Sequence, residues 1–130
     1  MGIARRKIVA PRPHPETEAY WQAAAAGQLL LKQCRACAEF HYYPRAICPH
    51  CLSDATQWIT STGRGRLYSY STMGAADAAY TLAYVTLDEG VTMLTNIVAC
   101  DADDVQIGQA VTVVFQNTDN GAPVPMFKPA

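Results

Sequence analysis

The hydrophobic pattern of the first 27 residues predicts a short helix behind an extended arm. Residues 1–15 are rich in proline, which restricts φ and lacks an N–H donor, so this stretch is expected to stay extended. In residues 16–26 acidic side chains come first and an alanine run follows, and Gly27 then ends the helical pattern. The positions that share one helix face are Tyr20, Trp21 and Ala24. A helix this short is marginal in water, so we expect that face to dock on the chain or on a partner.

Beyond Gly27 the pattern changes to short extended runs separated by turns. Residues 28–33 and 40–45 each precede a pair of cysteines, which suits the two arms of a hairpin. From residue 58 onward, runs of β-forming residues alternate with turn residues, and Asp88-Glu89-Gly90 is a tight hairpin signal. The strands expected there cover residues 58–62, 66–73, 80–87, 91–100 and 109–116, with a last short piece around Met126 and Phe127.

Several of these strands are apolar on both faces. Val91, Met93 and Ile97 point one way along their strand. Leu94 and Val98 point the other way. Because an open sheet with one wet face would alternate apolar and polar residues, we expect a small closed barrel whose outer face is also covered. The pattern therefore predicts a mainly β fold that ends in a five-stranded OB-fold barrel, with an SH3-like barrel or a small sandwich as rival folds.

Composition supports a packed domain and excludes several classes of protein. Half of the 130 residues are hydrophobic and 16% are charged, which supplies a core and argues against a disordered tail. No stretch approaches the roughly 18 to 20 apolar residues of a membrane span. The basic start at Arg5, Arg6 and Lys7 runs into prolines rather than an apolar segment, so it does not resemble a signal peptide. We expect a cytoplasmic protein with no membrane partner.

Charge is divided unevenly between the two halves of the chain. Residues 1–66 hold nine lysines and arginines and four acidic residues, a balance of +5. Residues 67–130 hold one lysine and seven acidic residues, a balance of −6. This asymmetry indicates two modules or one oriented interaction surface.

Four of the five cysteines form the strongest chemical signal in the chain. Cys34 and Cys37 are followed, after ten residues, by Cys48 and Cys51. A hairpin that brings two such C-x2-C pairs together places four thiolates around one metal ion at about 2.3 Å. Zinc accepts this geometry without redox chemistry, and iron is the geometric alternative. Because sulfur fills all four positions, this zinc ribbon offers no open position to substrate, and we interpret the metal as structural.

Other residues near the cysteine pairs have simpler interpretations. His41 and His50 could supply one ligand of a Cys3His site, but with four well-spaced cysteines we interpret them as surface or supporting residues. Ala38 and Leu52 stand where a glycine often follows the second cysteine, which predicts looser turns. Cys100 ends an apolar strand and is interpreted as a small buried hydrophobe rather than a nucleophile.

No catalytic arrangement emerges from the residues. The histidines lie in the arm and the ribbon, and the acidic residues of the β-rich half fall in expected turns. Arg64 and Arg66 flank Gly65 at a strand start, where they could contact an anion. Tyr68 and Tyr70 are expected to share one strand face, where the rings stack on bases, fill a core or meet a protein. The acidic balance of this half argues against a nucleic-acid groove.

An ordered set of short motifs runs along residues 14–130. In the N-terminal half these are Thr17-Glu18-Ala19-Tyr20-Trp21, Gly27-Gln28-Leu29, the first cysteine pair, Tyr43-Pro44-Arg45 and Cys48-Pro49-x-Cys51. In the C-terminal half they are Ser61-x-Gly63-Arg64-Gly65-x-x-Tyr68-Ser69-Tyr70, Leu87-Asp88-Glu89-Gly90, residues 94–98, Ile107-Gly108 and Val111-x-Val113-x-Phe115. Together these motifs resemble a widespread family of bacterial and archaeal proteins that join a rubredoxin-like zinc ribbon to an OB fold, a family long known as a domain of unknown function.

The resemblance implies a helper rather than a lone enzyme. Members of the family are typically found with thiolase-superfamily partners: thiolases, acyltransferases and the lipid-transfer-type aldolases of steroid side-chain breakdown. Others sit beside hot-dog-fold enoyl-CoA hydratases. The resemblance places structural Zn²⁺ at Cys34, Cys37, Cys48 and Cys51. It also assigns Tyr20 and Trp21 to a docking helix and makes the OB barrel the body that faces the partner and CoA.

The expected organisation has three parts: a basic arm and docking helix (1–27), the zinc ribbon (28–57) and the OB-fold barrel (58–130). The expected function is that of a non-catalytic accessory subunit of a thiolase-superfamily acyl-CoA enzyme complex, which stabilises its partner and helps hold or channel the CoA thioester. The phosphates of CoA need cations. The candidates are Arg64 and Arg66, together with Arg5, Arg6 and Lys7.

Two other functions remain open at this stage. A zinc-ribbon OB protein that binds single-stranded nucleic acid would show steeply salt-dependent affinity. A free-standing acyl-CoA binder or enzyme would bind CoA thioesters without a partner.

Overall fold

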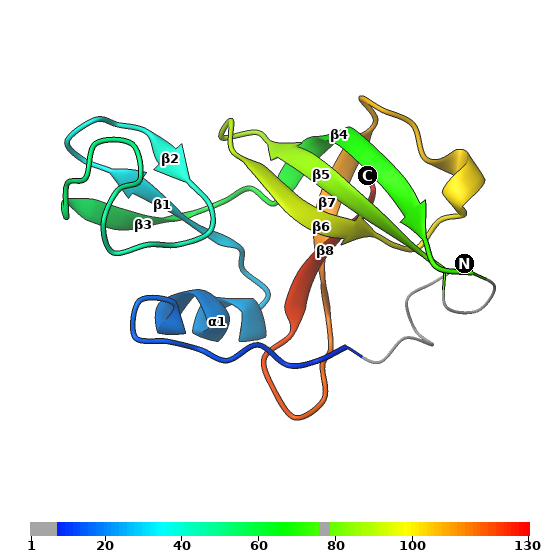
Figure 1. Cartoon of the computed structure of the whole chain (residues 1–130), viewed down its shortest axis with the longest axis horizontal. Helices are drawn as coiled ribbons and strands as arrows, with labels where there is room; N and C mark the ends of the chain where they lie inside the picture. The colour runs from blue at the N-terminus through cyan, green and yellow to red at the C-terminus, as the bar shows by residue number, and fades with distance from the viewer. Residues whose placement is uncertain (1–7, 76–78) are drawn as a thin grey trace.

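The computed structural model describes residues 8–75 and 79–130, which form a small ribbon sheet beside a closed barrel (Figure 1). Arg5, Arg6 and Lys7, three of the expected CoA contacts, lie outside the described residues. Among the ranges that are described, no helix combines the length and apolarity that a membrane span requires.

The expected helix is present as α1 (Glu18–Ala25), slightly shorter than the pattern indicated. Thr17 precedes it, and the Thr17 hydroxyl accepts a hydrogen bond from the His14 backbone N–H at 2.9 Å, which ties the arm to the helix start. Gly27, with φ of 81°, ends it in the left-handed conformation that glycine adopts without steric cost. The face predicted to dock is buried, and its residues are Tyr20, Trp21 and Ala24.

The ribbon is a three-stranded antiparallel sheet with the strand order β2-β1-β3. Its strands are β1 (Leu30–Cys34), β2 (Phe40–His41) and β3 (Thr56–Thr60). β3 pairs along its whole length with β1, from Leu30 opposite Thr60 to Cys34 opposite Thr56. The strand expected over residues 58–62 therefore does not open the barrel. It closes the ribbon, because strand propensity predicts an extended segment but tertiary packing selects its partner.

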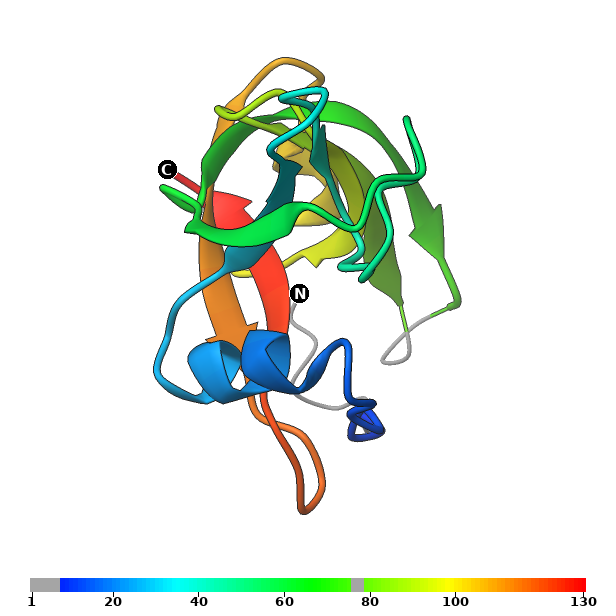
Figure 2. The same ribbon diagram turned by 90° about the vertical axis from the view of Figure 1, so that its left-hand side faces the viewer.

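The barrel consists of β4 (Arg64–Met73), β5 (Tyr80–Leu87), β6 (Thr92–Ile97), β7 (Ala110–Gln116) and β8 (Val124–Pro129). It closes in the order β4-β5-β6-β8-β7, with antiparallel pairs except for the parallel contact of β6 with β8. Five strands closed in this order form an OB-fold barrel, as the pattern predicted, and the SH3-like and sandwich alternatives are excluded. The ribbon lies beside one end of the barrel (Figure 1) and therefore in front of it in the turned view (Figure 2).

The barrel is filled by alternate side chains from its strands. Phe127 on β8 is fully buried and lies opposite Val113 and beside Ile97 in the strand register. Each fully buried side chain of this size stabilises the fold by about 1.5–3 kcal/mol. The same apolar cluster continues to α1 and the ribbon, so one core connects the two parts. Its barrel members include Leu67, Ala83, Val85, Leu87, Met93, Ile97, Val111 and Phe127.

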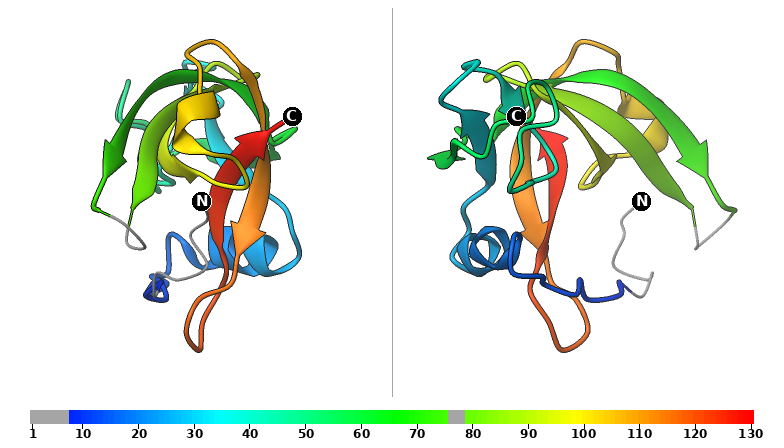
Figure 3. Two further views of the ribbon diagram at one scale, coloured as in Figure 1. Left: turned by 90° about the vertical axis from the view of Figure 1, so that its right-hand side faces the viewer. Right: turned by 60° about the vertical axis from the view of Figure 1, so that its left-hand side comes forward.

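The outer face of the barrel differs from the expectation that it would also be covered. Tyr84 on β5 and Leu94 on β6 are 46% and 50% exposed. The ends of β4 and β5 project away from α1 and the ribbon (Figure 3). The prediction of a covered face was wrong for this part of the barrel. A sequence pattern shows that a face is apolar, but it does not show whether the same chain covers that face.

Candidate metal centre and its surroundings

The four predicted cysteine ligands converge on one point at the tip of the ribbon. Their sulfur atoms all lie within 4.8 Å of one another. The Cys34 and Cys51 sulfurs are 3.6 Å apart, and those of Cys37 and Cys48 are 3.7 Å apart. A tetrahedral zinc–thiolate site with bonds of about 2.3 Å has sulfur–sulfur edges of about 3.8 Å. The arrangement therefore fits structural zinc, and sulfur occupies every corner of the tetrahedron.

Each cysteine pair is built on the same tight turn. The backbone N–H of Ala38 donates to the carbonyl of Cys34, and that of Leu52 donates to the carbonyl of Cys48, both at 2.9 Å. Ala38 and Leu52 have φ of 65° and 67°. They adopt the left-handed conformation that glycine usually supplies here, at a cost of about 1–2 kcal/mol each. The turns are therefore formed tightly and under strain, rather than loosened.

Backbone N–H groups also prepare the sulfur atoms for a metal. The N–H of Ala36 donates to the Cys34 sulfur, and that of His50 donates to the Cys48 sulfur, both at 3.3 Å. Hydrogen bonds from the backbone of Cys37 and Ala36 lower the pKa of the Cys34 thiol to about 7. Burial and the neighbouring sulfurs raise the pKa of Cys37 and Cys51, so the backbone donors favour the metal-binding thiolate at Cys34 rather than at all four sulfurs.

The two ribbon histidines take no part in the cysteine cluster. Over the described ranges, the group of side chains close enough to share a metal consists of the four cysteines. The ring Nε2 of His50 lies 3.2 Å from the carbonyl oxygen of Phe40. His41 is buried in the sheet, and burial lowers the pKa of its imidazole, so it remains neutral.

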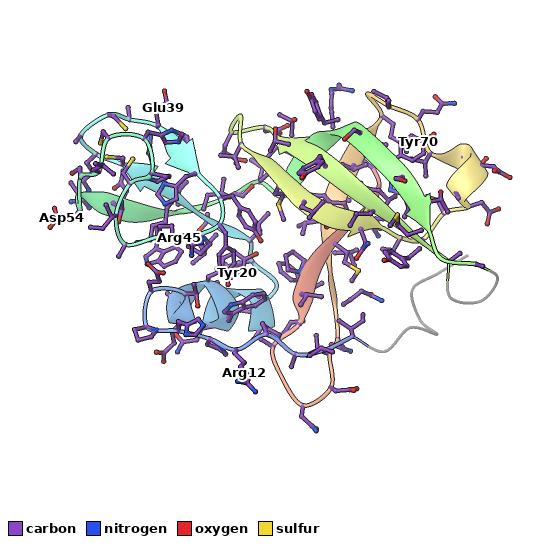
Figure 4. The ribbon with its side chains drawn as sticks, in the orientation of Figure 1. Arg12, Tyr20, Glu39, Arg45, Asp54 and Tyr70 are labelled. Carbon is purple, nitrogen blue, oxygen red and sulfur yellow. The ribbon has the colours of Figure 1, made fainter. Side chains whose placement is uncertain are left out.

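An aromatic cluster holds α1 against the ribbon, with Tyr20 between the two (Figure 4). The hydroxyls of Tyr20 and Tyr42 are 2.7 Å apart, and the indole N–H of Trp21 donates to the Tyr43 hydroxyl at 3.0 Å. The rings of Tyr20 and Trp21 meet edge to face, 4.7 Å between centroids. The docking face of the helix is thus occupied by its own chain. From the sequence, Tyr43 was singled out only as part of the Tyr43-Pro44-Arg45 motif, and neither Tyr42 nor Tyr43 was assigned to the contact with the helix, although a pair of tyrosines before Pro44 is an available signal.

A polar contact at Glu16 supports the second cysteine turn from the helix side. The Glu16 carboxylate accepts a hydrogen bond from the backbone N–H of Ala46 at 2.9 Å and lies 3.6 Å from the Arg45 guanidinium. The arm before α1 and the loop before Cys48 are thereby joined. Together with the aromatic cluster, this contact makes the helix part of the ribbon.

The predicted anion contacts, Arg64 and Arg66, lie on the exposed face at the start of β4, which pairs there with both β5 and β7. Arg64 forms an exposed ion pair with Asp88 at 3.8 Å, and Arg66 donates to the carbonyl of Gly108 at 3.0 Å. Gly65 between them is buried, and a side chain at this position would overlap the carbonyl oxygen of Thr86. Packing of β4 on β5 accounts for this glycine, and both arginines remain accessible.

The prediction that Tyr68 and Tyr70 share one strand face fails because β4 contains a bulge between Leu67 and Ser69. A bulge shifts the alternation of a strand by one residue. Tyr70 consequently pairs with Ala83, whose side chain faces the core, and Tyr68 is left outside the pairing at 65% exposure. The two rings do not form a regular stacking platform.

Glu89, expected to be a solvated turn residue, instead connects the ribbon to the barrel. Its carboxylate accepts hydrogen bonds from the Ser61 hydroxyl and from the backbone N–H of Thr62, both at 2.9 Å. These residues form the link between β3 and β4. The turn between β5 and β6 therefore fixes the linker that leaves the ribbon.

Family models match both parts of the chain. One describes the rubredoxin-like zinc ribbon domain of ChsH2 and matches residues 21–57, and the other describes the C-terminal OB-fold domain of ChsH2 and matches residues 58–116. A DUF35 domain-containing scaffold protein of Methanothermobacter thermautotrophicus is 33% identical over 68% of this chain and 71% of its own length. The chain belongs to the DUF35 family.

A second relative and a solved structure are each similar to nearly the whole chain. This DUF35 chain is 32% identical, over 95% of its length, to a probable enoyl-CoA hydratase alpha subunit of Thermomonospora curvata. It spans 41% of that longer relative. A solved chain described as Ltp2-ChsH2(DUF35) aldolase superposes with a TM-score of 0.79 at 29% identity, covering 92% of this chain and 98% of that one.

Proposed function

We propose that this DUF35 chain is a non-catalytic accessory subunit of a thiolase-superfamily acyl-CoA enzyme complex. The proposal rests on one observation. The structural match to a chain of the Ltp2-ChsH2(DUF35) aldolase covers 92% of this chain and 98% of that one. The scaffold description of the Methanothermobacter relative supports the same role. The subunit would stabilise its partner and help to hold or channel the CoA thioester.

In this role the metal is structural and is held by Cys34, Cys37, Cys48 and Cys51. The ion supplies cross-linking of the two turns, because four sulfurs leave it no position for water or substrate. The residues around it orient the sulfurs and connect the ribbon to α1. The proposed division is into arm and helix (1–27), ribbon (28–57) and barrel (58–130), although Trp58–Thr60 of β3 pair within the ribbon sheet. It separates the metal from the surfaces that would meet a ligand.

Arg64 and Arg66 are the proposed contacts for CoA phosphates among the described residues. Both are exposed, and the Arg64–Asp88 pair is long and open to solvent, so a phosphate can replace it at little cost. An arginine–phosphate pair is a strong, charge-assisted hydrogen bond. The site would be completed by the partner, since both arginines are exposed.

A hot-dog-fold enoyl-CoA hydratase is a second candidate partner. The name of the Thermomonospora relative favours it, because the region shared with this chain is part of a longer protein described as a hydratase subunit. Single-stranded nucleic acid is a weaker alternative ligand. The broken Tyr68 and Tyr70 platform and the acidic barrel both argue against it.

Co-expression with the thiolase-superfamily protein encoded nearest to it tests the proposal. We expect the two chains to elute together in size-exclusion chromatography, and the partner to lose turnover of acyl-CoA when this chain is omitted. A partner that turns over equally well alone would contradict the proposal. Co-elution with a hydratase instead would favour the second candidate.

The CoA contacts need a separate experiment. Replacing Arg64→Gln and Arg66→Gln together should raise the KM of the complex for its CoA thioester about tenfold, with kcat little changed. Arg12→Gln, at another exposed arginine, is the matched control. An unchanged KM in the double variant would remove these two residues from the proposed site.

A further inference from the structure

The outer face of β4, β5 and β6 is apolar and open to solvent. The strand register aligns Ser69, Tyr84 and Leu94 in one row across the three strands. The neighbouring row contains Ser71, Leu82 and Asn96. We define the β4–β6 face by Ser69, Ser71, Leu82, Tyr84 and Leu94. Tyr84 and Leu94 lie directly opposite each other at its centre, each about half exposed.

This face has no charge at its centre, balanced charge at one end and negative charge beyond the other. Residues 67–73, 80–87 and 92–97 include no charged side chain. At the β5–β6 turn, Asp88 pairs with Arg64 and Glu89 binds the β3–β4 link, whereas exposed acids at 101, 103 and 104 follow the other end of β6. Interface cores are depleted of charge and surrounded by a polar margin, which is the distribution seen here.

Two shallow hollows lie on and beside the β4–β6 face and share Leu82 and Leu94. The smaller, of about 140 Å³, lies between β4, β5 and β6. The larger, of about 340 Å³, extends to Ile8 of the arm, Tyr42 of the ribbon and Met126 of β8. None of the described residues that line them carries a charge. A nucleic acid or the phosphates of CoA would need cations there, so the lining favours an uncharged occupant.

We propose that the β4–β6 face is the surface on which the partner enzyme subunit docks. The chemistry of the face selects a folded protein surface that is apolar at its centre and basic at the margin beyond β6. The apolar centres would bury Tyr84 and Leu94, and cations of that margin would lie near the exposed Asp103 and Asp104. This inference rests on the proposed function and deepens it by naming the docking surface.

Charge distinguishes this occupant from a second copy of the chain. The barrel, residues 58–130, contains seven acidic residues against three basic ones, Arg64, Arg66 and Lys128. Two copies joined through this face would bring two acidic barrels together, which repel each other. A partner with a basic margin would be attracted instead.

The experiment compares two exposed apolar residues of the barrel in the complex. Leu94→Glu places a charge at the centre of the β4–β6 face, and Ile107→Glu makes the same change at a 69% exposed residue outside it. Binding to the purified thiolase-superfamily subunit is measured by calorimetry, after thermal unfolding has shown that both variants fold. We expect Kd to rise at least about tenfold for Leu94→Glu and less than about threefold for Ile107→Glu.

The outcomes separate this inference from the proposed function. If the wild-type chain does not bind the thiolase-superfamily subunit, the proposed function fails and the docking surface fails with it. If the wild-type chain binds and Leu94→Glu binds equally well, only the location is overturned. If the isolated chain is a dimer that Leu94→Glu converts to a monomer, the face belongs to a second copy. If Leu94→Glu fails to fold, Leu94→Ala and Tyr84→Ser replace it and should each weaken binding severalfold.

Discussion

The ribbon and the barrel are stabilised in different ways. The ribbon has three short strands, one of only two residues, and its tip depends on four sulfurs and on aromatic contacts with α1. The barrel closes on itself around a continuous apolar core. Units as small as the ribbon bury too little surface to fold on packing alone and usually need a metal. The difference indicates that metal removal and core mutation should act on different parts of the molecule.

Removing the metal should have the largest effect, and that effect should be confined to the ribbon. We expect Cys34→Ser, or chelation, to remove on the order of 10 kcal/mol of metal-linked folding energy and to unfold the ribbon at room temperature. Both tryptophans, Trp21 and Trp58, lie in the helix and ribbon, so their fluorescence reports this part alone. Cys100→Ser is the control. If the tryptophan fluorescence of the folded protein is unchanged after zinc is lost, the ribbon does not depend on the metal, and the contrast with the barrel is contradicted.

Removing a large side chain from the barrel core should destabilise the barrel and leave the ribbon intact. Phe127→Ala removes a fully buried ring, which should lower the free energy of unfolding of the barrel by about 3–5 kcal/mol. Chemical denaturation followed by circular dichroism measures this loss. Zinc content by elemental analysis should stay at one ion per chain. Loss of zinc together with barrel stability would show that the two parts unfold as one unit.

Alkaline pH should weaken the contact between helix and ribbon. Burial raises the pKa of Tyr42 from 10.0 to about 12, so folding favours its neutral form. Stability from this group is complete below pH 10 and is lost as pH rises through about 12, a loss of about 3 kcal/mol. Absorbance of tyrosinate and tryptophan fluorescence should change together in this range. In Tyr42→Phe the fluorescence change should be smaller between pH 10 and 12.

The smallest predicted effect concerns strain at the first cysteine turn. Ala38→Gly should stabilise the metal-loaded ribbon by up to about 1 kcal/mol, because glycine adopts its φ of 65° without steric cost. Ala36→Gly in the same turn is the matched control. Ala36→Gly should destabilise the ribbon by about 0.4–1 kcal/mol, because glycine raises the conformational entropy of the unfolded chain and relieves no strain in the folded one. The denaturant midpoint of each variant, followed by tryptophan fluorescence, measures the change in stability. If the two substitutions shift the midpoint in the same direction, the strain argument is contradicted.

Features that depend on near neighbours in the chain were predictable. The helix and its buried face follow from the spacing of Tyr20, Trp21 and Ala24, and the four sulfurs follow from two C-x2-C pairs. Four of the five barrel strands were also expected, and β8 was expected as a short piece around Met126 and Phe127, because β-forming runs and turns are local signals. The partner of β3, the bulge in β4 and the contacts of Glu89 were not, since each depends on residues far apart in the chain.

The outer face of the barrel separates what the sequence determines from what only the tertiary structure decides. By itself, the sequence determined that β5 and β6 are apolar on both sides, because side chains alternate across any strand. Only the tertiary structure decided that one side fills the barrel and that Tyr84 and Leu94 on the other remain exposed. The reason is that burial depends on what the rest of the chain covers. Here α1 and the ribbon pack against each other instead and leave this face open.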